Sequence, residues 1–273
     1  MTPDKRDYML PTRQDLWKLC LNHYRRLIAA AGFLSILSLP GNRRLFTGDV
    51  VEASPLMGAE YFPLVGLLLA ALLSLLALLL APLVPQLVLA ALLVAGLIVL
   101  TGGLHLDGLM DSCDGLFGGS TRERKLEIMR DSRVGSFGVL AGGCALLLKF
   151  ACFASLSKHS LPVALLVTLP SARWTLVLAL RVFPGARATG LGATFRQAVT
   201  PDRLALACAL TFASVFLTAQ LSGLIVWGTI TAVALVSGAW ISRKLGGLTG
   251  DTYGAIAEIA EIIGLLVFVL LHF

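Results

Sequence analysis

The chain has 273 residues, of which 57% are hydrophobic and only 14% are charged, and its formal net charge is +6. This apolar content exceeds what a water-soluble domain needs, so it excludes an ordinary soluble enzyme. The sequence predicts an all-α, polytopic membrane protein that forms a single domain over residues 1–273. The excess of positive charge is explained by membrane topology and attraction to anionic lipid, and nothing indicates nucleic-acid binding.

The amino-terminal part of the chain is charged and then briefly apolar. The first 26 residues contain no apolar run ahead of a small-residue cleavage site, so we expect no cleavable signal peptide. Residues 27–40 are apolar but too short for a crossing, and they predict a re-entrant or interfacial segment. The main alternative is that this stretch is an additional, eighth transmembrane span beside the seven predicted below.

Apolar runs of about 20 residues, the length that crosses a bilayer, recur along the rest of the chain. We predict seven transmembrane helices, at residues 61–81, 85–101, 134–157, 162–183, 204–222, 224–242 and 254–273.

The distribution of positive charge orients these spans. With seven crossings, the amino-terminal region and the segments 102–133, 181–203 and 243–253 fall on one side of the membrane. All lysines and arginines lie there except Lys149, Lys158 and Arg173. The positive-inside rule makes that side cytoplasmic. We therefore predict a multi-pass protein of the bacterial inner membrane whose active site faces the cytoplasm.

Three aspartates directly after a predicted span form the most informative stretch, at residues 101–119. Asp107, Asp111 and Asp114 are four and three residues apart, so on a helix they share one face, where carboxylates repel one another unless a cation binds. A solvated surface is the ordinary meaning of such a run, but unpaired carboxylates beside a bilayer are costly. We predict that the three aspartates bind Mg²⁺ and are catalytic.

A short internal similarity links this stretch to a second one. The motif Gly-Gly-Leu-x-x-Asp occurs at residues 102–107 and again at 246–251, and each copy has another acid seven residues later, Asp114 and Glu258. Coincidence in a Gly/Leu-rich chain is the alternative, because repeats in membrane proteins leave only weak sequence symmetry. We expect the two segments to face each other across one cavity.

A second acidic cluster, Asp251, Glu258 and Glu261, lies at the start of the last predicted span. An acid within an apolar run must face protein or water rather than lipid. We predict that the three acids add ligands to the metal site or orient a substrate hydroxyl. The alternative is that the glutamates pair with Arg173 or Lys149 inside the membrane.

Several further residues are candidates for binding substrate or moving a proton. Arginines and a Gly/Ser-rich helix start at residues 130–136 suggest a phosphate site, although a cytoplasmic anchor of arginines fits equally well. Weaker candidates are the intramembrane Arg173, the loop residue Arg187 and Glu60 at a membrane boundary. His105 is a general base, a ligand or a histidine that supports the ligands. The substrate-binding candidates are Arg130, Asp131, Arg133, Arg173, Arg187 and Glu60.

These features together indicate transfer at a phosphate group, in which a metal polarises phosphorus and stabilises the leaving phosphate. No side chain has the sequence context of an enzyme nucleophile. The residues alone give a reaction type and no substrate.

The chain closely resembles the cobalamin synthase family. The resemblance rests on the block from Thr101 to Gly115, on Leu-Glu-Ile-Met-Arg-Asp-Ser-Arg-Val-Gly-Ser-Phe-Gly at 126–138, and on shorter matches at 62–66, 171–173, 190–192 and 246–261. One departure is at residues 37–40, Leu-Ser-Leu-Pro, where the family often has an arginine that Arg43 or Arg44 would have to replace.

The resemblance implies the final nucleotide-loop assembly step of coenzyme B12 biosynthesis. In that reaction α-ribazole or its 5′-phosphate attacks the diphosphate of adenosylcobinamide-GDP and GMP leaves, with Mg²⁺ as cofactor. The alternatives are a phosphotransferase of the CDP-alcohol type, whose Asp-Gly-x-x-Ala-Arg motif is not met, and a cation transporter. A homo-oligomer and association with other B12-assembly enzymes are both left open.

Overall fold

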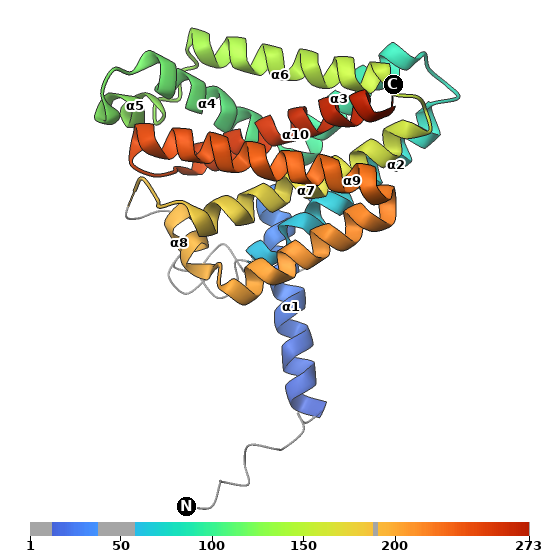
Figure 1. Cartoon of the computed structure of the whole chain (residues 1–273), viewed down its shortest axis with the longest axis horizontal. Helices are drawn as coiled ribbons and strands as arrows, with labels where there is room; N and C mark the ends of the chain where they lie inside the picture. The colour runs from blue at the N-terminus through green and yellow to red at the C-terminus, as the bar shows by residue number, and fades with distance from the viewer. Residues whose placement is uncertain (1–12, 38–57, 188–190, 273) are drawn as a thin grey trace, which may run out of the picture.

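The computed structural model describes residues 13–37, 58–187 and 191–272, and the remaining residues, among them Arg43 and Arg44, lie outside its description. The described chain is helical, as the sequence predicts, and most of its helices run side by side in one bundle (Figure 1). In chain order the helices are α1 (Arg13–Leu34), η4 (Ala59–Tyr61), α2 (Phe62–Leu80), α3 (Gln86–Thr101), α4 (Leu104–Gly118), α5 (Arg122–Ile128), α6 (Ser136–Ser155), α7 (Ser160–Val182), α8 (Leu191–Ala198), α9 (Pro201–Leu245) and α10 (Gly250–His272).

The described residues include five helices, or helix pairs in direct succession, that are long and apolar enough to cross a membrane: η4 with α2, α6, α7, α9 and α10. A sixth candidate is α3 together with α4, which are bent by 88° at a break between them. This arrangement is that of an all-α, polytopic membrane protein. The bent pair is either one broken span or a re-entrant segment, and α4 packs against the candidate spans α6 and α10.

Helix α9 is a hairpin of two arms rather than one straight rod. Gln220 has non-helical backbone angles, with φ 45° and ψ −125°. A Cβ added at Gly223 would lie 2.8 Å from the Val215 carbonyl oxygen, although eight residues along a straight helix span about 12 Å. The rings of Phe212 and Trp227 are likewise only 6.2 Å apart. The two arms correspond to the spans predicted at 204–222 and 224–242.

Helix α7 lies at the centre of the bundle. The most apolar window of this helix is 83% buried, the largest share among the candidate spans. Helix α2 approaches it closely, because a Cβ added at Gly66 would lie 2.6 Å from the Leu169 carbonyl oxygen. A larger side chain at Gly66 would separate the two helices, so this glycine is needed for their packing.

The two Gly-Gly-Leu motifs form the same local structure. Gly102 and Gly103 have φ of 61° and 72°, and Gly246 and Gly247 have φ of 72° and 148°, values that glycine adopts without a steric penalty. The Gly103 amide donates to the Ile98 carbonyl at 3.0 Å, and the Gly247 amide donates to the Ser242 carbonyl at 3.1 Å. Both motifs are therefore helix ends of the Schellman type. Each turns the chain directly into the helix that carries the following aspartate.

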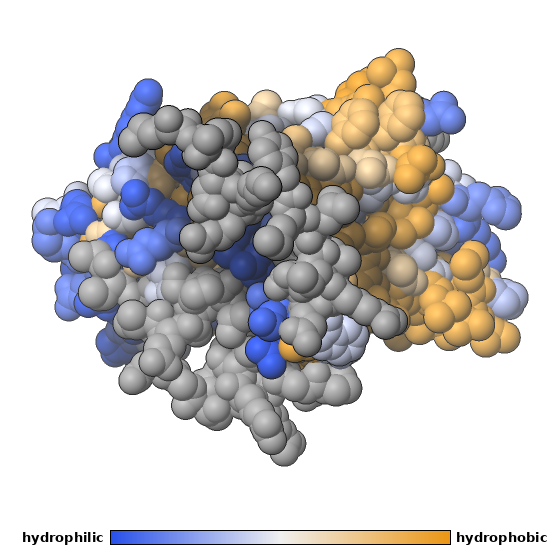
Figure 2. All heavy atoms as spheres, turned by 90° about the horizontal axis from the view of Figure 1, so that it is seen from below, coloured by the Kyte–Doolittle hydropathy of each residue, from blue (hydrophilic) through white to orange (hydrophobic). Residues whose placement is uncertain are grey.

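Three segments predicted to share one side of the membrane meet at one end of the bundle. They are residues 102–133, 181–203 and 243–253. Arg122 of α5 donates to the Leu245 carbonyl at 2.6 Å and to the Ala186 carbonyl at 3.1 Å. The Ala186 amide donates in turn to the Leu248 carbonyl at 2.8 Å. Figure 2 shows hydrophilic side chains gathered toward one end and hydrophobic ones over much of the other. The arrangement agrees with the charge-based grouping of these segments.

Helix α1 corrects the expected boundary of the amino-terminal segment. The stretch from 27 to 40 was expected to be a short apolar element, but the helix begins at Arg13. Its second half is in the core, where Ile28, Ala30 and Leu34 are buried, whereas Trp17 and Tyr24 are exposed. In Figure 1 the first half extends away from the bundle. Hydropathy detects only the apolar part of such a helix, because the exposed part carries charged and polar residues.

Candidate active site

A cavity of about 200 Å³ lies between the amino-terminal halves of α4 and α10 on one side and α8 on the other. We call it the carboxylate cavity, because Asp107 and Asp251 line it. Most of its wall is apolar. Phe33, Phe62 and Phe195 form one part of that wall, with ring centroids 4.6 to 6.0 Å apart. A cavity with two carboxylates and an aromatic wall can bind a ligand that is both charged and planar.

The two Gly-Gly-Leu motifs bring Asp107 and Asp251 to one cavity, as the internal similarity predicts, but the two segments lie side by side on one wall and do not face each other across it. Helices α4 and α10 are in close contact there. A Cβ added at Gly108 would lie 2.7 Å from the Asp251 carbonyl oxygen, and one added at Gly254 would lie 3.4 Å from the His105 Cα. Glycine at these positions therefore allows the two helices to bring their aspartates together.

Asp111 lies one turn along α4 from Asp107 and experiences the same negative field. The carboxylates of Asp107, Asp251 and Asp114 are close enough to repel the negative charge of Asp111. Such mutual repulsion favours a bound cation. In the described part of the chain, no three acidic, histidine or cysteine side chains converge closely enough to form a complete metal-binding group. Two or three carboxylate oxygens completed by water and substrate phosphate are nevertheless what Mg²⁺ commonly binds, so these residues fit the ion.

Asp114 is engaged differently from the other two aspartates of α4. One of its oxygens accepts a hydrogen bond from the Gly135 amide at 2.7 Å and the other from the Gly138 amide at 2.8 Å. These amides lie at the amino terminus of α6, so the Asp114 carboxylate caps that helix and compensates its positive end. The helix start that resembled a phosphate cradle thus already holds an anion from the protein. A metal role for Asp114 stays a prediction.

We expect Asp114→Ala to lower the free energy of unfolding by about 1–2 kcal/mol, the usual cost of losing a helix cap. Equilibrium unfolding in detergent micelles measures this, with the exposed Asp202→Ala as a matched control. Unchanged stability together with complete loss of enzymatic activity would instead support a metal-binding role for Asp114.

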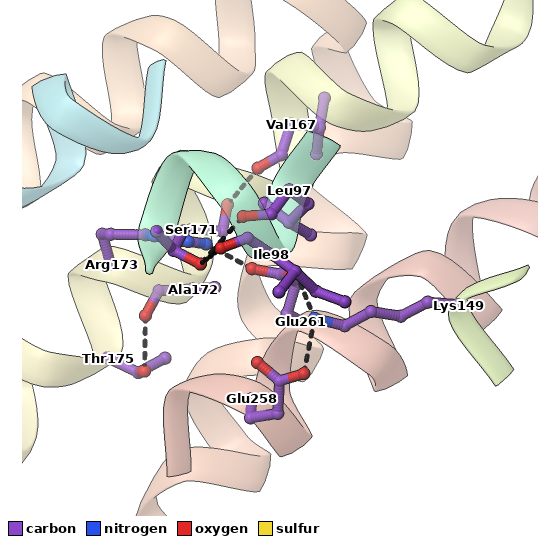
Figure 3. A network of polar contacts seen from close by, with 11 residues as sticks. Leu97, Ile98, Lys149, Val167, Ser171, Ala172, Arg173, Thr175, Glu258 and Glu261 are labelled. Carbon is purple, nitrogen blue, oxygen red and sulfur yellow. Dashed lines mark hydrogen bonds and ion pairs between the residues drawn. The ribbon is translucent and has the colours of Figure 1, made fainter. Parts of the chain in front are cut away.

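The predicted glutamates of α10 form a buried cluster of four charges, which we call the ion-pair tetrad (Figure 3). Lys149 of α6 lies 2.6 Å from Glu258 and 2.6 Å from Glu261, and Arg173 of α7 pairs with Glu261. All four side chains are at most 5% exposed. The pairing alternative that the sequence left open is thus the observed arrangement. A role of these glutamates or of Arg173 toward metal or substrate stays a prediction.

His105 lies between the carboxylate cavity and the ion-pair tetrad. It is buried, and it lines both the carboxylate cavity and a small void of about 20 Å³ beside the tetrad. Burial disfavours the charged imidazolium, and the neighbouring charges of Arg173 and Glu261 act on it in opposite directions. A neutral His105 therefore fits the role of a hydrogen-bonding partner better than that of a proton acceptor.

The predicted phosphate-binding loop at residues 130–136 lies away from the cavity. Asp131 and Arg133 pair with each other at 2.6 Å on the surface, and hydrogen bonding to Arg133 lowers the pKa of Asp131 to about 2. Arg130 is exposed. None of these three residues lines the carboxylate cavity. Their assignment to substrate binding stays a prediction that the geometry does not favour.

Glu60 joins helices instead of lining the cavity. It is 1% exposed and lies 3.3 Å from Arg26 of α1 and 3.8 Å from Arg203 of α9. A buried carboxylate between two cations fixes the positions of both helices. Its predicted contact with substrate is therefore less well supported than a structural role.

Sequence reasoning missed or ranked too low the residues around α8. Tyr253 lines the carboxylate cavity, and its buried hydroxyl has no hydrogen-bond partner among the residues that the structure describes. Arg187 and Arg196 line a second cavity on the other side of α8. Their positions depend on how a short helix between two loops packs against α10, and no local pattern in the sequence specifies that.

Comparison with known proteins identifies relatives over nearly the whole chain. The model of the family described as cobalamin-5-phosphate synthase (CobS) matches residues 26–269. A protein from Roseiflexus sp. is 40% identical over 236 residues, covering 86% of each chain. A second from Desulfitobacterium hafniense is 41% identical over 248 residues, covering 89% of this chain and 95% of the relative.

Both relatives carry the name adenosylcobinamide-GDP ribazoletransferase, as does a protein from Syntrophobacter fumaroxidans that is 39% identical over 241 residues, covering 86% of this chain and 94% of that relative. No solved structure matches the chain significantly. The family match includes both Gly-Gly-Leu motifs and every helix that lines the carboxylate cavity. The chain therefore belongs to the cobalamin-5-phosphate synthase family.

Proposed function

We propose that this protein catalyses the last step of nucleotide-loop assembly in the carboxylate cavity. The reaction transfers the cobinamide-phosphate group of adenosylcobinamide-GDP to a hydroxyl of α-ribazole or α-ribazole 5′-phosphate, and GMP is released. The membership of the cobalamin synthase family and the shared name of its relatives support this activity. The active site is assigned to this cavity because Asp107 and Asp251 both line it.

We further propose Mg²⁺ as the cofactor. Asp107 and Asp251 line the cavity and would supply two of its oxygen ligands, and Asp111 adds negative charge one turn along α4. The ion would offset the charge of the diphosphate and stabilise the departing phosphate. The protein itself positions the reactants, since Asp107 and Asp251 are carried by two helices in direct contact. Glu258 and Glu261 are less suitable as ligands, because they are already paired with buried cations.

The cavity walls suggest how the organic parts of the substrates bind. The rings of Phe33, Phe62 and Phe195 offer flat apolar surfaces against which the base of α-ribazole can stack. A carboxylate of the cavity accepts the proton of the attacking hydroxyl in this proposal, in preference to the buried imidazole of His105.

The proposed orientation places the cavity on the cytoplasmic side of the bacterial inner membrane. The segments around the cavity carry most of the lysines and arginines, which the positive-inside rule assigns to the cytoplasm. Association with a second copy or with other enzymes of B12 assembly stays a prediction.

A cation transporter explains the arrangement less well. Transporters bind ions near the middle of the bilayer, at sites that open alternately to both sides. Here the acids deepest in the bundle, Glu258 and Glu261, are neutralised by Lys149 and Arg173. A CDP-alcohol phosphotransferase is disfavoured by the family match.

Metal removal tests the proposed function directly. The purified protein in lipid nanodiscs should release GMP from adenosylcobinamide-GDP and α-ribazole 5′-phosphate, and should lose this activity after treatment with EDTA. We expect added Mg²⁺ to restore it, because the cavity carboxylates alone cannot offset the diphosphate charge. GMP release at the original rate in the presence of chelator would refute the magnesium assignment.

A further inference from the structure

A second, basic cavity lies on the opposite face of α8 from the carboxylate cavity. It has a volume of about 270 Å³ and is lined by Gly185, Arg187, Ala193, Arg196 and Gln197. We call it the basic cleft. Gly192 and Phe195 of α8 line the carboxylate cavity, whereas Ala193, Arg196 and Gln197 line the basic cleft. Helix α8 therefore forms the wall between the two.

The two arginines of the basic cleft, of which Arg187 is partly buried and Arg196 is exposed, form no ion pair within the described part of the chain. The Nε and Nη2 atoms of Arg187 are buried and form no hydrogen bond with any described residue. Among the described residues, no carboxylate lies within 4.0 Å of the guanidinium group of Arg187 or Arg196. The buried cations Lys149 and Arg173, in contrast, are both paired. Two unpaired guanidinium groups in one cavity favour a bound anion.

The basic cleft lies directly beside the carboxylate cavity. Gly192 and Ala193 are neighbours on α8, and each lines one of the two cavities. A Cβ added at Gly192 would lie 3.6 Å from the Tyr253 ring and 3.9 Å from the Gly250 amide nitrogen. Tyr253 also lines the carboxylate cavity. An anion in the cleft would thus be a near neighbour of a molecule that reacts at Asp107 and Asp251.

The segment that carries Arg187 is held in place by the backbone. A parallel β-bridge joins Gly185 to Leu248, and the Leu248 amide donates to the Pro184 carbonyl at 2.8 Å. A Cβ added at Gly247 would lie 2.5 Å from the Gly185 carbonyl carbon, so the two backbones are in direct contact. Such a support reduces the entropy lost when a ligand binds.

We propose that the basic cleft is a phosphate-binding subsite, in which Arg187 and Arg196 hold a phosphate group of a substrate that reacts in the carboxylate cavity. The inference rests on the proposed function for the identity of that substrate. Two sources supply the same chemistry: the diphosphate of adenosylcobinamide-GDP and the 5′-phosphate of α-ribazole 5′-phosphate. A planar guanidinium binds either group through two hydrogen bonds.

Steady-state kinetics of Arg187→Gln, Arg196→Gln and the double variant test the proposal. We expect each single change to raise KM for the bound substrate about tenfold, since a charge-assisted hydrogen bond contributes about 1.5–3 kcal/mol. The kcat value should change far less than KM. Arg243→Gln, which removes an exposed arginine at the end of α9, is the matched control. Arg196→Lys should restore part of the affinity.

Three substrates distinguish the two sources. If the cleft holds the 5′-phosphate, KM rises for α-ribazole 5′-phosphate but not for α-ribazole. If it holds the diphosphate, KM rises for adenosylcobinamide-GDP with either acceptor. KM values in the double variant that equal those of Arg243→Gln for all three substrates would overturn the proposal.

Direct binding separates failure of this proposal from failure of the proposed function. Isothermal titration with inorganic pyrophosphate and phosphate should show binding to the unmodified protein that the double variant loses. The unmodified protein could bind pyrophosphate, and the double variant could lose this binding, while the unmodified protein releases no GMP. That result would refute the enzymatic assignment and keep the anion site. Equal binding by the double variant and the unmodified protein would overturn the anion site.

Discussion

Asp107→Asn and Asp251→Asn are each expected to lower kcat for GMP release by about a thousandfold, the upper range for losing one electrostatic contact to a transition state. Both carboxylates line the carboxylate cavity, and asparagine preserves shape while removing the charge that would hold Mg²⁺. Rates measured over a range of Mg²⁺ concentrations would also reveal weaker metal binding.

The matched control is Asp202→Asn, which removes an exposed carboxylate at the start of α9. It should retain full activity. Gel filtration of each variant from detergent establishes that the protein has inserted and folded. Full activity in either Asp107→Asn or Asp251→Asn would contradict a site shared by the two Gly-Gly-Leu motifs.

Lys149→Met is expected to have the largest effect on stability, a loss of about 3–5 kcal/mol in the free energy of unfolding. Lys149 is the only partner in the ion-pair tetrad that contacts both Glu258 and Glu261. Removing it leaves two buried carboxylates with Arg173 alone, and uncompensated charge in the core is costly. Unfolding in mixed micelles of increasing denaturant content measures the change.

Two further variants make that test specific. Lys244→Met removes an exposed lysine of α9 and should change the stability by less than about 0.5 kcal/mol. The double variant Lys149→Met/Glu258→Gln should be more stable than Lys149→Met, because it removes one of the orphaned charges. Stability of Lys149→Met equal to that of Lys244→Met would show that the tetrad contributes nothing.

The ion-pair tetrad also relates stability to the active site. It joins α10 to α6 and α7, and Asp251 lies two helical turns before Glu258 on α10. The tetrad therefore determines the depth at which α10 presents Asp251 to the cavity. Two anions and two cations make it electrically neutral, so the charge of the cavity is determined by its own carboxylates.

The sequence predicted the class of fold, and its long apolar runs lie in α2, α3, α6, α7, α9 and α10. Long apolar runs leave few structures other than membrane helices, because every backbone polar group in lipid must be satisfied internally. The repeated Gly-Gly-Leu motif also predicted that Asp107 and Asp251 line one cavity, since a double glycine ahead of a helix start is a local feature. The 88° bend between α3 and α4 could not be predicted, because glycine permits many angles and packing selects one.

The partners of individual charges were much less predictable. Asp114 shares its helix with Asp107, and only the contact with Gly135 and Gly138 of α6 shows that it caps a helix. Arg130 and Arg196 are equally ordinary in sequence, yet only Arg196 lines a cavity. Such differences arise from contacts between distant segments, which a single sequence does not record.

The short connections at the end of the bundle opposite the cavity affect how the protein enters the membrane. Only residues 81–85 separate α2 from α3, only 156–159 separate α6 from α7, and the arms of α9 meet at Gln220. On the proposed orientation Lys158 is the only lysine, arginine or acid in these three connections. Translocation of each connection then needs little work against the membrane potential. The charged loops that build the active site remain on the side where the ribosome delivers them.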